Sequence, residues 1–140
     1  MNTLPIKLVV LALVTGMGIA GAADVLIANP GVAKSALTKE QVKNMLLGKS
    51  KNWPGGSRVK LCVAKSGDAS ASGIKTYTRK TLAQFNLYWR KLAFSGKGKP
   101  PKQVGNDADV LAYVAANAGA IGFVAAGQST GGAKVISIQE

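Results

Sequence analysis

The segment from Lys65 to Gly73 carries the side chains of this sequence that are best suited to binding chemistry. It reads Lys-Ser-Gly-Asp-Ala-Ser-Ala-Ser-Gly and follows an apolar run at 59–64 that predicts a strand. A helix is expected after it, and backbone N–H groups at a helix N-terminus attract anions. Ligands of open α/β sheets bind beyond the carboxyl ends of strands, which is this position. The segment therefore predicts either an oxyanion site with donors Lys65, Ser66, Ser70 and Ser72, or an ordinary loop in which Ser70 or Ser72 caps the helix.

Thr38 offers the same choice at the start of another predicted helix. Thr38 and Gln41 have the spacing of a capping box, and Leu37 can pack on Val42 as a hydrophobic staple. Gly48 suits the left-handed position that ends such a helix. Capping alone explains Thr38, but the neighbouring amides could also meet an anion, so Thr38 is a lesser candidate for the same oxyanion chemistry.

Enzymatic and metal chemistry have little support in the sequence. The chain has no histidine, which is the commonest general base. It has only six acidic residues, and two of them, Asp107 and Asp109, suit the first turn of a helix. No Cys/His cluster has metal-ligand spacing. Cys62 is the only cysteine and lies in an apolar run, which indicates a buried thiol and no internal disulfide. The sequence predicts a non-enzyme with no catalytic residue, no metal and no cofactor.

Residues 1–22 have the pattern of a signal peptide. Lys7 precedes an apolar run at 8–14, and Ala20-Gly21-Ala22 is an A-x-A cleavage site. A membrane anchor is the alternative, but the run is shorter than the roughly 20 apolar residues that a span needs. Export to the periplasm with cleavage near Ala22 is therefore expected. The remaining residues, 23–140, would form a single domain with no transmembrane segment and a formal charge of +11, because only Lys7 is lost from the +12 of the whole chain.

Alternating patterns within 23–140 predict an α/β fold with a layered sheet flanked by helices. Strands are expected at 25–28, 59–64, 121–125 and 135–138, and helices after Thr38, Thr81 and Asn106. The helix after Thr81 has an aromatic face that is expected to be core, and Trp53 is expected to anchor a turn. That face comprises Phe85, Tyr88, Trp89 and Leu92.

The basic composition favours anionic partners. Lys97, Lys99 and Lys102 are expected in one loop, which is either a solvated surface or a contact for a polyanion or membrane. Nucleic-acid readers interleave aromatic with basic residues, whereas the aromatic residues here lie on a helical core face. Nucleic acid is therefore not the expected partner.

Several short motifs, taken in order, resemble the phosphate-binding proteins of ABC importers. They are Leu37-Thr38, Leu47-Gly48-Lys49 with Trp53, and Ala118-Gly119-Ala120-Ile121-Gly122-Phe123. The resemblance implies one lobe of a type II periplasmic binding protein. Lys65-Ser66 is similar to the Arg-Ser pair that binds phosphate in the family. Ser70-Ala71-Ser72 is similar to the Ser-Gly-Thr that follows it, after one inserted residue.

The resemblance implies non-enzymatic periplasmic binding of phosphate or a similar oxyanion, serving ABC-type uptake or phosphate sensing. Because full-length family members close two lobes on the ligand, a homodimer or an envelope protein partner is expected to complete the cleft. The alternative is an interaction module that has lost its ligand and docks on an envelope protein or a polyanion.

Overall fold

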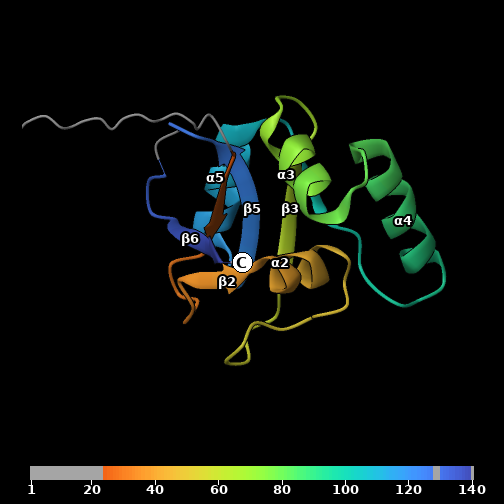
Figure 1. Ribbon diagram of the computed structural model, residues 1–140, viewed down its shortest axis with the longest axis horizontal. Coiled ribbons are helices and arrows are strands. Elements are labelled where there is room, and N and C mark those ends of the chain that lie inside the picture. Colours follow the sequence, from red (N-terminus) through yellow and green to blue (C-terminus); the bar gives the residue numbers. More distant parts are fainter. Residues whose placement is uncertain (1–23, 128–129, 140) are drawn as a thin grey trace, which may run out of the picture.

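The computed structural model describes residues 24–127 and 130–139. The predicted signal peptide, residues 1–22, lies outside the described residues. The elements in chain order are β1 (Asp24–Ala28), β2 (Ala36–Thr38), α2 (Lys39–Leu46), β3 (Lys60–Ala64), α3 (Ala69–Thr78), α4 (Leu82–Phe94), β4 (Lys102–Val104), α5 (Asp107–Ala116), β5 (Ala120–Ala125) and β6 (Lys134–Gln139). The predicted α/β fold is confirmed, and the elements are shown in Figure 1.

The described strands form one sheet in the order β2-β6-β1-β5-β3-β4. β1 is antiparallel to both of its neighbours, β5 and β6. β3 is parallel to β5 and β4, and β2 is parallel to β6. All strands of the sheet except β1 therefore run in the same direction, so their carboxyl ends lie at one edge of the sheet.

Helices cover both faces of the sheet. Alternation along each strand sends Leu26 and Phe123 to the face covered by α2 and α3, and sends Ile27 and Val124 to the face covered by α5. In Figure 1, α3 lies in front of β3 and β5, and α5 lies behind the sheet. Cys62 is on the α5 face and is buried, as predicted. These two apolar layers position the loops at the sheet edges.

α4 extends away from the sheet and is attached through its aromatic face, as predicted (Figure 1). The Trp89 indole N–H donates to the Leu46 carbonyl at 2.9 Å, and the Tyr88 hydroxyl donates to the Leu47 carbonyl at 2.5 Å. Both acceptors lie at the C-terminus of α2, where helical carbonyls lack intrahelical donors. Gly48 (φ +76°) ends that helix, and a Cβ there would lie 2.6 Å from the Trp89 ring. α4 is therefore fixed at the end of α2.

The Gly-Ala-Ile-Gly motif has structural roles at the start of β5. Gly119 (φ +78°) accepts hydrogen bonds from the Trp53 indole N–H (2.8 Å) and from the Lys60 backbone N–H (3.0 Å). A Cβ on Gly119 would lie 2.0 Å from the Arg58 carbonyl oxygen. A Cβ on Gly122 would lie 2.7 Å from a Val110 methyl group. Trp53 therefore anchors its turn, as predicted, and the motif allows close packing.

The structure corrects three predictions. α3 begins at Ala69 rather than after Ser72, so Ser70 and Ser72 lie inside its first turn. Its N-cap is Asp68, whose side chain makes no capping hydrogen bond, and neither serine caps the helix. Lys102 begins β4 and is not part of a loop. The loop segment was rich in small residues without apolar periodicity, so the pattern did not locate the start of α3.

Candidate functional site

The loop between β3 and α3 lies at the carboxyl edge of the sheet, as the sequence predicted. The Lys65 backbone N–H donates to the Val104 carbonyl at 2.8 Å, and Ser66 donates to the Gly105 carbonyl through both its backbone N–H (3.0 Å) and its hydroxyl (2.7 Å). These bonds fix the loop against the segment that follows β4. The Lys65 side chain is exposed. Its ammonium group is therefore accessible to solvent.

Backbone amides without acceptors gather beyond this loop. Among the described residues, the backbone N–H groups of 67–71 donate no hydrogen bond, whereas the Ser72 N–H donates to the Asp68 carbonyl at 2.8 Å. The first amides of a helix have no intrahelical acceptor, and the helix dipole adds positive potential at this end. Backbone amides at a helix N-terminus and a nearby lysine are the types of donor that suit an oxyanion.

The two predicted serine donors lie in different environments. The Ser70 side chain is only 1% exposed, and its hydroxyl oxygen accepts from the Ala64 backbone N–H at 3.0 Å. Ser70 therefore satisfies the amide at the end of β3. The Ser72 side chain is exposed on the first turn of α3. The role of both serines in binding stays a prediction, and Ser72 is the more accessible of the two.

Thr38 lies at the other side of the sheet. It ends β2 and caps α2, and its hydroxyl oxygen accepts from the Gln41 backbone N–H at 3.1 Å, which confirms the predicted capping box. Three strands, β6, β1 and β5, separate β2 from β3 in the sheet. At about 4.8 Å for each strand spacing, Thr38 is roughly 19 Å from the end of β3 along the sheet. The structure therefore does not bring Thr38 together with Lys65 and Ser66.

Asp107 is a polar group beside the loop that sequence reasoning did not assign to the site. One of its carboxylate oxygens, Oδ2, accepts from the Ala125 backbone N–H at 2.9 Å. The other, Oδ1, is buried and has no hydrogen-bond partner among the described residues. A Cβ on Gly67 would lie 3.4 Å from Oδ1, so this oxygen faces the loop. Its negative charge opposes an anion at the start of α3.

The remaining chemistry of the described residues is sparse. No group of His, Cys, Asp or Glu side chains within 24–127 and 130–139 could hold a metal ion. Burial raises the pKa of the Cys62 thiol to about 11, with Lys102 lowering it and Asp109 raising it. A thiol with that pKa is a poor nucleophile at neutral pH. Within the same residues, no helix has the length and apolar character to cross a membrane.

Comparison with known proteins identifies the fold. No protein-family model and no curated protein matches the chain. A phosphate ABC transporter substrate-binding protein from Clostridium perfringens, solved with bound phosphate, superimposes with a TM-score of 0.64 at 15% identity, covering 83% of this chain and 44% of that one. PstS from Borrelia burgdorferi superimposes with a TM-score of 0.62 at 16% sequence identity, and the match covers 84% of this chain and 47% of PstS. An ABC-type phosphate transport receptor from Vibrio cholerae superimposes with a TM-score of 0.56 at 16% sequence identity, and the match covers 83% of this chain and 46% of the receptor.

The chain has the fold of one lobe of these substrate-binding proteins. The resemblance suggested by the sequence is thus confirmed at the level of fold. The chain spans less than half the length of the solved proteins that it matches. Of the predicted donors, Lys65, Ser66, Ser70 and Ser72 are gathered around the start of α3, and Thr38 lies elsewhere.

Proposed function

We propose that this protein is a non-enzymatic solute-binding protein for phosphate or a similar oxyanion. The observation that supports the proposal is the run of backbone amides at 67–71, which have no acceptor and lie beside Lys65 at the carboxyl edge of the sheet. Amide donors at a helix N-terminus suit a compact oxyanion, because several of them can reach it at once. Ser72 would add a hydroxyl donor, whereas the Ser66 hydroxyl already donates to the Gly105 carbonyl and the Ser70 hydroxyl holds the end of β3.

The proposed site needs a second surface. The described residues correspond to less than half of the phosphate-binding proteins with the same fold. A site that is open on one side leaves the anion partly hydrated, and well-formed ligand sites bury most of the ligand. We therefore propose that a second copy of the chain, or an envelope protein partner, completes the cleft for ABC-type uptake or phosphate sensing in the periplasm.

Calorimetry tests the proposed oxyanion site. Phosphate is titrated into the purified protein at about 150 mM sodium chloride, with sulfate as the comparison anion. We expect saturable heat that Lys65→Ala weakens about tenfold, because a hydrogen bond to a charged group is lost. Lys75→Ala is the matched control, since Lys75 is an exposed lysine near the other end of α3. Equal affinity in the Lys65→Ala variant and the unchanged protein would contradict the assignment.

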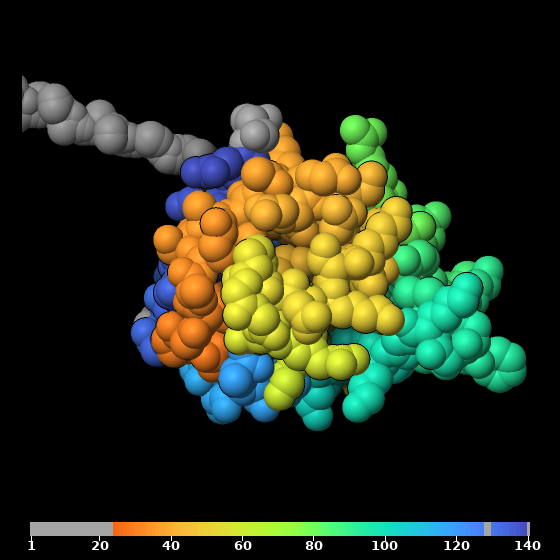
Figure 2. Space-filling model, turned by 90° about the horizontal axis from the view of Figure 1, so that it is seen from below, coloured from red at the N-terminus to blue at the C-terminus, as the bar shows by residue number. Residues whose placement is uncertain are grey.

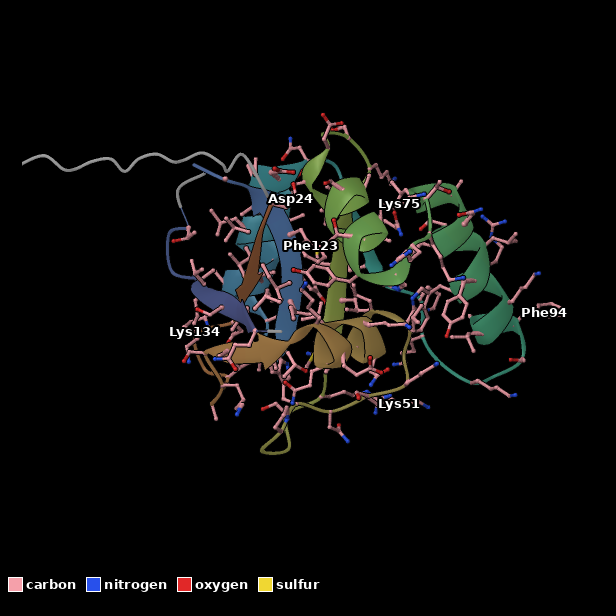
Figure 3. The ribbon with its side chains drawn as sticks, viewed as in Figure 1. Asp24, Lys51, Lys75, Phe94, Phe123 and Lys134 are labelled. Atoms are coloured by element: carbon pink, nitrogen blue, oxygen red, sulfur yellow. The ribbon has the colours of Figure 1, made fainter. Side chains whose placement is uncertain are left out.

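A second candidate function is docking on an envelope protein or polyanion, and the surface of α4 favours it. Phe94 is 95% exposed and Leu87 46% exposed, and Figure 3 shows Phe94 pointing away from the body of the molecule at the end of α4. Aromatic side chains are enriched in protein interfaces. Phe94→Ser should abolish recovery of a protein partner from envelope extract if docking is the function. Recovery of the same partner by the Phe94→Ser variant would exclude this role for α4.

A further inference from the structure

A cleft lies at the amino ends of β3 and β4, opposite the proposed oxyanion site. Its volume is about 400 Å³, within the range of small-molecule sites. Lys60 is the first residue of β3 and Lys102 the first of β4, and both line the cleft. The C-terminus of α2 and the segment after α4 form its other walls. In Figure 2, these two segments, gold to yellow and turquoise, border each other on the right of the molecule.

The charged lining of the cleft has one sign. Five cationic side chains contribute to it, and no carboxylate does. They are Lys51, Arg58, Lys60, Lys99 and Lys102. A concave surface with several like charges focuses a field of that sign and attracts the opposite charge. The lining therefore suits an anion that carries more than one negative charge.

The backbone around these cations is held by hydrogen bonds. The Lys51 ammonium group donates to the Lys97 carbonyl at 3.1 Å, and the Lys51 carbonyl accepts from the Val59 backbone N–H at 2.9 Å. The Lys60 backbone N–H donates to the Gly119 carbonyl, which also accepts from the Trp53 indole. The cations are thus presented from ordered segments that are far apart in the sequence. The backbone that carries these cations therefore needs little reorganisation on binding.

Apolar side chains form part of the inner wall of the cleft. Trp89, Met45, Leu61 and Tyr113 line it, and Trp89 is only 6% exposed. A Cβ on Gly98 would lie 3.0 Å from the Trp89 ring, so the glycine allows the chain after α4 to approach that ring closely. Inorganic phosphate would leave these apolar surfaces in contact with water. An anion with a hydrocarbon part would cover them, and each buried CH₂ group contributes about 0.8 kcal/mol.

We propose that this cleft binds a small organic anion that joins a phosphate-like group to an apolar body. The cations bind the charged group, and the side chains around Trp89 contact the apolar body. The site is separate from the start of α3. It takes a different class of ligand, so it does not depend on the proposed oxyanion function.

Octyl phosphate is a suitable probe, with octanol and inorganic phosphate as its two halves. Each is titrated into the uniformly ¹⁵N-labelled protein, and the amide shifts are followed. Octyl phosphate should saturate at one equivalent and shift the amides of Gly48, Leu61 and Gly98, which line the cleft. Octanol should bind at least about tenfold more weakly, because it lacks the charge-assisted hydrogen bonds.

Paired charge variants supply the control. The double variant Arg58→Gln, Lys60→Gln should bind octyl phosphate at least about tenfold more weakly. The double variant Lys34→Gln, Lys75→Gln loses the same net charge from exposed positions outside the cleft, and its affinity for octyl phosphate should be unchanged. Thermal melts check that both variants are folded. Equal weakening by the two pairs, equal affinity for octanol, or shifts confined to other residues would overturn the proposal. Lys65→Ala should not change octyl phosphate binding, so loss of the oxyanion site is distinguishable from loss of this one.

Discussion

The two ends of the sheet offer an anion different kinds of donor. At the carboxyl end, the donors are backbone amides at the start of α3 and one lysine, and the carboxylates of Asp68 and Asp107 lie close by in the loop and beside it. At the amino end, five cationic side chains line a cleft that also contains apolar side chains and no carboxylate. Directional amide donors discriminate by geometry, whereas flexible cations attract any anion of suitable size. A cluster of cationic side chains therefore distinguishes the amino end, and backbone amides at a helix N-terminus distinguish the carboxyl end.

Gly119→Ala is expected to lower the stability of the protein most, because it disrupts packing at the amino end of the sheet. The new Cβ would lie 2.0 Å from the Arg58 carbonyl oxygen, and the backbone is left-handed there. Clash and strain together should cost about 3 kcal/mol or more of unfolding free energy, measured by urea denaturation. Gly96→Ala is the matched control, since Gly96 has φ +77° with nothing within 4 Å of its Cβ, and should cost about 1 kcal/mol. Similar losses in both variants would show that conformation alone explains Gly119.

The pH dependence of stability tests whether Cys62, in the middle of β3, is buried away from water. Its folded-state pKa of about 11 exceeds the ordinary value of 9.0, so the unfolded chain releases the thiol proton first as the pH rises. The stabilisation is fully present below pH 9 and should fall by about 2 kcal/mol as the pH approaches 11. Comparison with Cys62→Ala isolates this loss from the titration of lysine and tyrosine. Parallel pH profiles for the two proteins would mean that the thiol is not desolvated.

Ser70→Ala separates a structural from a binding role at the carboxyl end. It removes the acceptor of the Ala64 backbone N–H, and an unpaired buried donor costs about 1–3 kcal/mol, so we expect a loss of about 1.5 kcal/mol in urea denaturation. Ser72→Ala is the control and should change stability by less than about 0.5 kcal/mol, because Ser72 is exposed. Unchanged stability with lost phosphate binding in Ser70→Ala would assign Ser70 to the ligand instead.

Asp107→Asn removes a carboxylate from the carboxyl end of the sheet, so that this end, like the amino end, has fewer negative charges near the bound anion. The asparagine side-chain oxygen can still accept from the Ala125 N–H, while the negative charge beside Gly67 disappears. Phosphate affinity should rise about threefold in calorimetry, the modest gain expected when one nearby like charge is removed. The affinity for octyl phosphate at the amino end of the sheet should be unchanged. A fall in phosphate affinity would mean that the carboxylate accepts a hydrogen bond from the bound anion.

Local signals predicted much of the fold. The capping residues Thr38, Thr81 and Asn106 begin their helices as expected, and Gly48 is left-handed. The edge strands β2 and β4 were missed, because each has three residues and no clear alternation. Of the site, the loop at Lys65 and Ser66 followed from its place after a strand. Asp107 beside that loop and the cleft around Trp89 arise from contacts between residues distant in the sequence, which spacing does not reveal.

Amide shift mapping with inorganic phosphate locates the proposed oxyanion site residue by residue. The purified ¹⁵N-labelled protein is titrated to millimolar phosphate, with sodium chloride keeping the ionic strength constant. We expect saturable shifts of the amides at 67–71, which lack acceptors, and none at Gly48 or Gly98. Shifts confined to the amino end, or no saturable shift at either end, would contradict the proposed oxyanion site.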